Sequence, residues 1–200
     1  MLVISLKSST KNNGMKSLII FDFYGVIGGE IAPKWFKNHF DMPLADELKA
    51  KYFIPADQGR YSFKETLERI AKDYNFNYDD ILKEMSTYVV VNNELLDYIL
   101  ELRKNNDVAL LSNAAKGIYD MLFPNLDLNK YFDKVFISAY HNMQKPDLRF
   151  YKLCVDSFNK EYDEIYMIDD NIKNISHLNE IGIKGILYKN NQELFDILKK

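Results

Sequence analysis

The segment Lys16–Phe23, KSLIIFDF, is followed directly by Tyr24 and Gly25. Its nearly continuous run of β-branched and aromatic residues is typical of a strand buried on both faces of a parallel sheet. Gly25 indicates a sharp turn just past this strand, which places Asp22 at the strand's carboxyl end. Because ligands bind beyond the carboxyl ends of strands in open parallel sheets, Asp22 is the first candidate functional residue.

Four more segments have the same strand-like character, and helical patterns lie between them. The further expected strands are Val108–Leu111, Lys134–Ser138, Ile165–Ile168 and Gly185–Leu187. The expected helices are Asn93–Asn105, Ala115–Phe123, Asp147–Asn159, Lys173–Ile181 and Gln192–Lys199. Strand alternating with helix predicts an α/β fold, a three-layer Rossmann-like parallel sheet with helices on both faces.

The connection between the first two strands breaks this alternation. Its helix-like stretches are Lys34–Phe40, Leu44–Lys51, Ser62–Asp73 and Tyr78–Met85, with prolines 33, 43 and 55 expected at the boundaries. Ser62 and Glu65 have the spacing of a capping box. A crossover of roughly 85 residues greatly exceeds the usual minimum of about 10–12, which predicts an all-helical insertion. We therefore divide the chain into an N-terminal extension (1–14), a core domain (15–30 and 92–200) and a helical cap (31–91).

Composition excludes several classes of protein. The chain has 200 residues, of which 47% are hydrophobic and 28% charged, with a formal net charge of −3. This balance predicts a globular protein and does not favour nucleic acid or anionic lipid as a partner. A single cysteine excludes a disulfide scaffold, and no apolar run approaches the roughly 20 residues of a membrane span. We expect a cytoplasmic protein, and the sequence leaves its oligomeric state open.

Polar residues follow four of the expected strands. They are Asp22, then Ser112 and Asn113, then Lys145, then Asp169 and Asp170. Since the carboxyl ends of parallel strands share one rim of the sheet, three carboxylates, a lysine and a serine are expected to converge there.

These segments resemble a known family. The runs IIFDFYGVI (19–27), LLSNA (110–114), KPDLRFY (145–151) and IDDN (168–171) are similar, in this order, to the four motifs of the haloacid dehalogenase (HAD) superfamily. The long interval after the first run suits the branch of that superfamily with a helical cap after strand one. The resemblance covers essentially residues 15–200.

The resemblance implies a metal-dependent nucleophilic mechanism. Asp22 matches the nucleophile, which attacks phosphorus and forms an aspartyl-phosphate. Asp169 and Asp170 match the acidic pair that holds Mg²⁺, with Asp22 and the Tyr24 carbonyl as further ligands. Lys145 would neutralise charge on the nucleophile and the phosphate.

Phosphate binding is also implied by the resemblance. Ser112 and the backbone N–H of Asn113 would hold phosphoryl oxygens, together with Lys145. The expected partner is therefore a small phosphorylated molecule.

The sequence departs from the family's phosphatase pattern at Tyr24. Phosphatases of the family usually carry a second aspartate there, which protonates the leaving alcohol, and a tyrosine with a pKa near 10 is a poor substitute. Tyrosine at this place is similar to the 2-haloacid dehalogenases, as is the Ser112-Asn113 pair. Those enzymes need no metal and generally lack the acidic pair, whereas Asp169 and Asp170 are both present here.

A third branch, the bacterial glucose-1-phosphate phosphatases, also lacks the second aspartate and keeps the acidic pair. The stretch Asp169–Asn174, DDNIKN, resembles that branch, as does the turn Gly59–Ser62, GRYS. We therefore favour a Mg²⁺-dependent phosphatase acting on a small phosphate monoester, with sugar phosphates as candidates. The alternatives are a 2-haloacid dehalogenase-like hydrolase and a catalytically idle phosphate-binding protein of the same fold.

Overall fold

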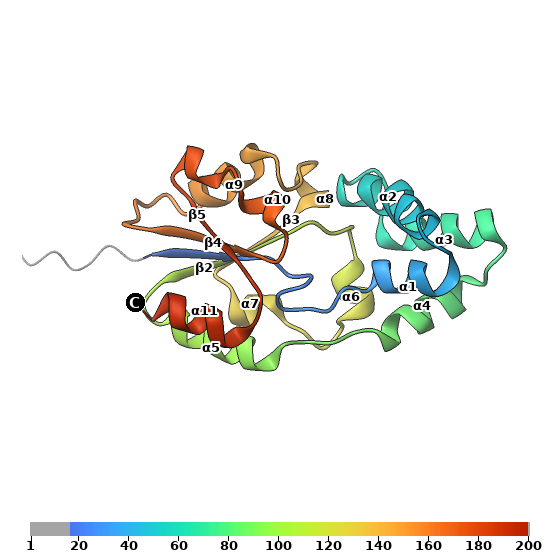
Figure 1. Cartoon of the computed structure of the whole chain (residues 1–200), viewed down its shortest axis with the longest axis horizontal. Helices are drawn as coiled ribbons and strands as arrows, with labels where there is room; N and C mark the ends of the chain where they lie inside the picture. Colours follow the sequence, from blue (N-terminus) through green and yellow to red (C-terminus); the bar gives the residue numbers. More distant parts are fainter. Residues whose placement is uncertain (1–16, 200) are drawn as a thin grey trace, which may run out of the picture.

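The computed structural model describes residues 17–199, so the expected extension, residues 1–14, lies outside the described residues. Within the described range, five parallel strands form one sheet in the order β3-β2-β1-β4-β5 (Figure 1). The strands are β1 (Leu18–Phe21), β2 (Asp107–Ser112), β3 (Lys134–Ile137), β4 (Ile165–Asp169) and β5 (Lys184–Leu187). Because β1 pairs with β2 on one side and β4 on the other, its carboxyl end lies in the middle of the rim.

Helices cover both faces of the sheet, which confirms the predicted three-layer α/β fold. On one face lie α5 (Asn93–Arg103), α7 (Leu128–Tyr131) and α11 (Asn191–Leu198), and on the other α8 (Ser138–His141), α9 (Leu148–Asp156), α10 (Ile172–Ile175) and the 3₁₀ helix η1 (Leu178–Ile181) (Figure 1). Successive side chains of β1 point to opposite faces. Ile19 and Phe21 pack in the cluster that contains the α5 side chains, while Leu18 and Ile20 pack with those of α9. Full burial of each such side chain stabilises the fold by about 1.5–3 kcal/mol.

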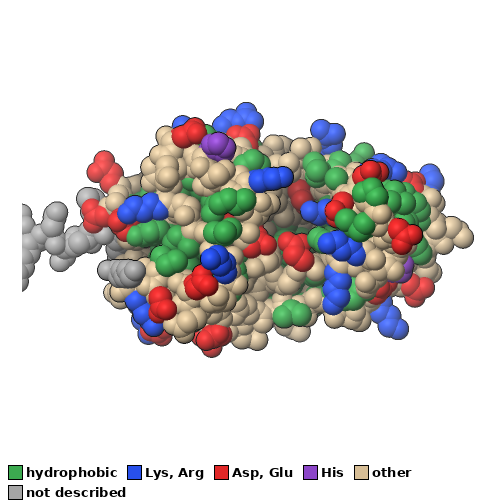
Figure 2. All heavy atoms as spheres, viewed as in Figure 1, with side chains coloured by type: hydrophobic (Ala, Val, Ile, Leu, Met, Phe, Trp, Pro, Cys, Tyr) green, Lys and Arg blue, Asp and Glu red, His purple; other side chains and the backbone are tan. Residues whose placement is uncertain are grey.

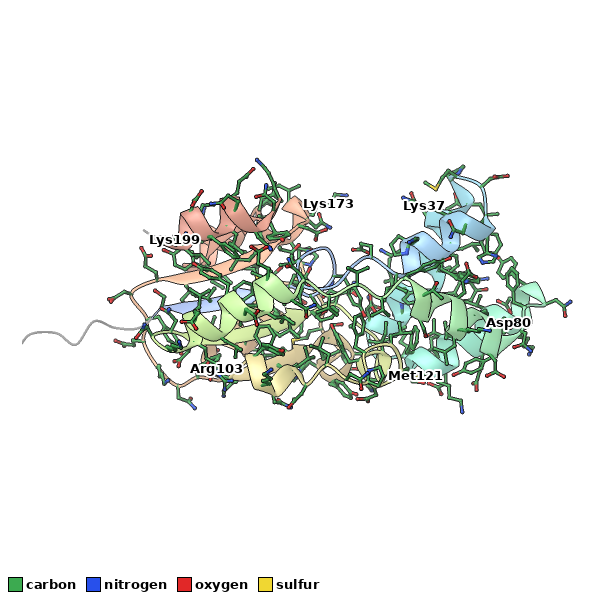
Figure 3. The ribbon with its side chains drawn as sticks, turned by 90° about the horizontal axis from the view of Figure 1, so that it is seen from below. Lys37, Asp80, Arg103, Met121, Lys173 and Lys199 are labelled. Atoms are coloured by element: carbon green, nitrogen blue, oxygen red, sulfur yellow. The ribbon has the colours of Figure 1, made fainter. Side chains whose placement is uncertain are left out.

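Four helices between β1 and β2 form the cap at one end of the molecule (Figure 1). They are α1 (Ala32–His39), α2 (Leu44–Asp57), α3 (Phe63–Tyr74) and α4 (Tyr78–Thr87). The fully buried Trp35 packs edge-on against Phe36 and Phe76, so aromatic side chains fill the interior of the cap. In Figure 3, Met121 of α6 (Ile118–Leu122) lies beside the cap, whereas Lys199 lies at the far end of the core.

Two of the expected helices differ from the observed ones by more than about three residues at an end. Pro55 lies inside α2, which continues to Asp57, so its assignment as a boundary was wrong. Proline in the last turn removes a single backbone donor, and the helix still closes when Gln58 N–H donates to the Ile54 carbonyl (3.1 Å). The helix expected over residues 173–181 is instead α10 followed by η1, which ends at Gly182 in the left-handed conformation.

The described residues contain no helix able to span a membrane. Across residues 17–199, none combines the length and the apolar character that crossing a bilayer requires.

Candidate active site

The ends of three neighbouring strands place the candidate residues together. Asp22 directly follows β1, Ser112 is the last residue of β2, and Asp169 is the last of β4. Asp22 N–H donates to the Ile168 carbonyl (2.9 Å), which holds the residue in line with β4. The strand register therefore fixes where these side chains start.

Lys145 reaches the site from the loop between α8 and α9. The Asn113 side chain ties this loop to the end of β2: its Oδ1 accepts from Lys145 N–H (2.8 Å) and its Nδ2 donates to the Lys145 carbonyl (3.0 Å). Sequence reasoning assigned only the backbone of Asn113 to the site and missed this use of its side chain. A polar residue directly after a strand was the available signal.

Lys145 is buried between two carboxylates. Its Nζ lies 2.7 Å from Asp22 Oδ1 and 2.6 Å from Asp169 Oδ2. Burial opposes the charge of Lys145, but the two carboxylates outweigh it and hold the pKa of Lys145 above its usual value. Charge-assisted hydrogen bonds of this length are strong, and removal of either partner leaves an uncompensated buried charge.

Asp22 is ionisable but costly to ionise without further positive charge. Burial raises the pKa of Asp22 to about 8, the charge of Asp169 adds to the rise, and Lys145 opposes it. One lysine thus does not neutralise the local carboxylates. A second cation in contact with Asp22 would favour its anionic, nucleophilic form.

The donor set at this rim fits a divalent cation. One carboxylate oxygen from each of Asp22, Asp169 and Asp170 lies within 4.8 Å of the others. A Cβ on Gly25 would lie 2.1 Å from Asp170 Oδ2, so glycine at this position leaves room for the Asp170 carboxylate. Among the described residues, no backbone N–H donates to the Tyr24 carbonyl, which faces no competing donor. Mg²⁺ prefers hard oxygen ligands of this kind.

Asn174 and Asn171 orient Asp169. Asn174 Nδ2 lies 3.0 Å from both carboxylate oxygens, and Asn171 N–H donates to Oδ1 (2.8 Å). Asp170, by contrast, accepts no hydrogen bond from another residue in the described part of the chain. The Asp170 carboxylate is therefore the freer of the pair to bind a cation. The DDNIKN stretch carried the signal for Asn174, but its contact with Asp169 required the structure.

Ser112 and Tyr24 contact the aromatic side chain of Tyr119. Ser112 is fully buried, and its Oγ accepts from Tyr119 OH (2.9 Å), which leaves the serine proton free to donate. The Tyr24 ring stacks on Tyr119 and meets Phe23 edge-to-face, and its hydroxyl has no hydrogen-bond partner among residues 17–199. Burial raises the pKa of Tyr24 well above its usual value. The assignment of Ser112 to phosphate binding stays a prediction.

A cavity of about 220 Å³ lies between the rim and the cap. Asp22, Lys145 and Asp170 line it from the core. The cap side is largely apolar, with Phe53, Phe63 and Met85, and its polar lining comes from Lys49 and Asp57. Glu30, at the end of the first core segment, also lines the cavity. Figure 2 shows charged side chains of both signs around a hollow between the two parts of the molecule. The arrangement can hold a cation beside a nucleophile and enclose a small substrate.

Comparison with known proteins identifies the family. A family model described as haloacid dehalogenase-like hydrolase matches residues 16–182. The chain belongs to this family. Drimenol cyclase drtB of Aspergillus calidoustus is 25% identical to this HAD-like hydrolase over 161 residues, which is 76% of the chain and 30% of that protein. The chain therefore spans less than a third of the length of this curated relative.

Solved structures share the fold of this HAD-like hydrolase. A HAD family enzyme of Bacteroides thetaiotaomicron, in complex with magnesium, has a TM-score of 0.77 and 23% identity, covering 94% of this chain and 100% of that one. The same enzyme with magnesium and inorganic phosphate has a TM-score of 0.72, 22% identity, and covers 91% and 100%. The L-2-haloacid dehalogenase of Xanthobacter autotrophicus is more distant, with a TM-score of 0.59, 18% identity, and coverage of 93% and 83%.

Proposed function

We propose that this HAD-like hydrolase is a Mg²⁺-dependent phosphatase that hydrolyses a small phosphate monoester through an aspartyl-phosphate on Asp22. One observation carries the proposal: Asp22, Asp169 and Asp170 form a carboxylate cluster beside a cavity, and Lys145 forms ion pairs with the first two. Sugar phosphates are the first substrates to test, because polar side chains in the cavity could bind sugar hydroxyl groups. Glu30 and Asp57 are hydrogen-bond acceptors there, and Lys49 is a donor.

In the first step an Asp22 carboxylate oxygen attacks phosphorus. The phosphorus–oxygen ester bond breaks, its electron pair goes to the leaving oxygen, and that oxygen takes up a proton to give the free alcohol. In the second step water attacks the aspartyl-phosphate, releases inorganic phosphate and restores the Asp22 carboxylate.

The other groups reduce the repulsion between an anionic nucleophile and an anionic substrate. Mg²⁺, held by Asp22, Asp170 and the Tyr24 carbonyl with Asp169 behind them, would supply positive charge to the phosphoryl oxygens. Lys145 neutralises Asp22 and a phosphoryl oxygen from the opposite direction, a task that suits a point charge. The backbone N–H of Asn113 and the Ser112 hydroxyl donate to the remaining phosphoryl oxygens.

The intact acidic pair favours this function over dehalogenation. A dehalogenase needs neither Asp169 nor Asp170. In this structure, three hydrogen bonds from two asparagines orient the Asp169 carboxylate. A similarly folded enzyme holds magnesium and inorganic phosphate, which supports the choice.

The test is hydrolysis of p-nitrophenyl phosphate with and without Mg²⁺. We expect turnover that requires Mg²⁺, stops on chelation, and falls about 10³-fold or more in Asp22→Asn. Asp46→Asn, an exposed aspartate on α2, is the matched control and should leave the rate unchanged. Chloride release from 2-chloropropionate without metal, combined with no phosphate release, would overturn the proposal in favour of dehalogenation.

A further inference from the structure

The leaving oxygen needs a proton, and Tyr24, although it lines the cavity, is a poor source of one. The Tyr24 hydroxyl lies among aromatic rings without a hydrogen-bond partner in the described chain. A phenol is a weak acid at neutral pH, so another group is needed to protonate the leaving oxygen.

Asp57 is held over the phosphate side of the cavity. It is the last residue of α2 and lines the cavity together with Asp22, Asn113 and Lys145. Its carbonyl accepts from Ser138 Oγ (2.6 Å), and the same Oγ accepts from Ala114 N–H (3.0 Å). This two-bond bridge ties the end of α2 to the segment after β2, where phosphoryl oxygens are expected to bind.

The Asp57 carboxyl is free and poised to exchange a proton near neutral pH. Across residues 17–199 no donor contacts it, and it has no ion pair. Burial raises the pKa of Asp57 to about 7, the charge of Glu30 adds to the rise, and Lys49 opposes it. Tyr24 and Tyr119 also face this carboxyl and are neutral at such pH. An acid whose pKa lies near the operating pH is the most effective proton donor.

Glu30 is another carboxyl at the cavity, but it is exposed to solvent, and the core charges that act on it are those of Asp170, Asp169 and Lys145. Asp57 is the less exposed of the two and carries the link to the end of β2. The geometry therefore favours Asp57.

We propose that Asp57 of the cap is the general acid and base of this hydrolase, in the place that Tyr24 cannot fill. The inference rests on the proposed phosphatase function. As the bond from phosphorus to the leaving oxygen breaks, the Asp57 carboxyl gives its proton to that oxygen, and the products are the alcohol, phospho-Asp22 and the Asp57 carboxylate. The carboxylate then takes a proton from the water that attacks phosphorus, and inorganic phosphate leaves with Asp22 restored.

The test compares two leaving groups at pH 7 with Mg²⁺. Phenyl phosphate releases a basic phenolate that needs a proton, whereas p-nitrophenyl phosphate releases a weakly basic anion that does not. We expect Asp57→Asn to lower kcat/KM about 10²-fold or more for phenyl phosphate and less than about 10-fold for p-nitrophenyl phosphate. The ratio kcat/KM is used because it reports formation of phospho-Asp22 and excludes its hydrolysis.

Two further variants separate this role from a structural one. Asp57→Glu keeps an acid and should recover much of the phenyl phosphate rate, while Asp46→Asn on the same helix should leave both rates unchanged. Equal losses for both esters in a folded Asp57→Asn protein would overturn the inference and leave the phosphatase function intact. Wild-type protein that hydrolyses neither ester would overturn the phosphatase function and the inference together.

Discussion

Gly25 leaves the space that the Asp170 carboxylate occupies in the acidic cluster. Its φ of +79° lies in the left-handed region, and a Cβ there would lie 2.1 Å from Asp170 Oδ2 and 2.4 Å from Asp170 Cγ. Gly25→Ala should therefore displace the Asp170 carboxylate and raise the Mg²⁺ concentration for half-maximal p-nitrophenyl phosphate hydrolysis about 10-fold or more. Calorimetric titration with Mg²⁺ should show the same shift without substrate.

A second glycine supplies the control for backbone strain. Gly182 has a φ of +75°, and a Cβ there meets no atom within 4 Å. Gly182→Ala should therefore cost about 1 kcal/mol of stability and leave the Mg²⁺ requirement unchanged. Equal Mg²⁺ requirements in Gly25→Ala and wild type would contradict the placement of Asp170 at the metal.

The Asp57 carboxyl also predicts a pH dependence of stability. The pKa of Asp57 is 3.8 in a model peptide and about 7 in the folded chain. The folded state therefore binds more protons between these values, so the free energy of unfolding falls as pH rises from about 4 to about 7. Asp57→Asn removes this loss and should be more stable than wild type at pH 8 by about 1–3 kcal/mol, and not at pH 4.

Urea unfolding of both proteins at pH 4, 6 and 8 measures this difference. Lys49 and Glu30 face Asp57 and are present in both proteins, so the comparison measures the loss of the Asp57 carboxyl together with its interaction with these two charges. A variant that is more stable and less active is the pattern expected of a catalytic group. A constant difference across the three pH values would contradict the raised pKa.

Some residues of the candidate site could be predicted from the sequence alone, and others could not. Asp22, Lys145 and Asp169 follow apolar strands or lie in recognisable runs, so their convergence follows from parallel topology. Asp57 has no such signal. An aspartate two residues after a proline in a helical stretch is typically solvated, and only the continuation of α2 through Pro55 places it at the cavity.

At the scale of elements, the capping box at the start of α3 is the feature read most directly from sequence. Ser62 Oγ accepts from Glu65 N–H (3.2 Å), and Glu65 Oε2 accepts from Ser62 N–H (2.7 Å), which confirms the predicted pair. Ser62→Ala removes the first bond and should destabilise the protein by about 1 kcal/mol in urea unfolding. Ser86→Ala, which removes only a bond to the Leu82 carbonyl within α4, is the control, and an equal loss there would argue against a specific cap.

Helices and strands were predictable from the sequence where the local pattern of apolar and polar residues determines them. The strands are short apolar runs, and β2 and β4 differ from the expected ranges by a residue or two at their ends. The α10–η1 region was not predictable, because its interruption depends on tertiary contact. A Cβ on Gly185 of β5 would lie 2.7 Å from Ile175 Cβ, so the close approach of the strand to α10 shapes this region.

At the scale of the whole molecule, the position of the cap on the core depends on contacts between distant parts of the chain. Phe63 N–H donates to the Lys116 carbonyl (2.8 Å), and Ser138 Oγ donates to the Asp57 carbonyl (2.6 Å). The sequence predicts a helical insertion at this place but contains no local signal for where it docks. The cavity and its polar lining from the cap are therefore results of the structure alone.

Gly59 lies close to the backbone of α8 and provides the last prediction. Its φ is +81°, and a Cβ there would lie 2.3 Å from the backbone oxygen of Ala139 and 2.8 Å from Asn142 Oδ1. The Ala139 backbone belongs to α8 and cannot rotate away, so Gly59→Ala should move the end of α2 off the rim and carry Asp57 with it. Activity with phenyl phosphate should fall about 10-fold or more, as a loss of positioning.

The Mg²⁺ requirement separates the two glycine variants. Every expected metal ligand belongs to the core, so Gly59→Ala should keep the wild-type Mg²⁺ titration while it loses the preference that Asp57 gives to poor leaving groups. Gly25→Ala should do the reverse, with a changed Mg²⁺ titration and a preserved ratio of phenyl to p-nitrophenyl phosphate rates at saturating metal. If both variants shifted both quantities alike, the cap and the metal site would not act as separable parts, and a single distortion of the rim would explain the data instead.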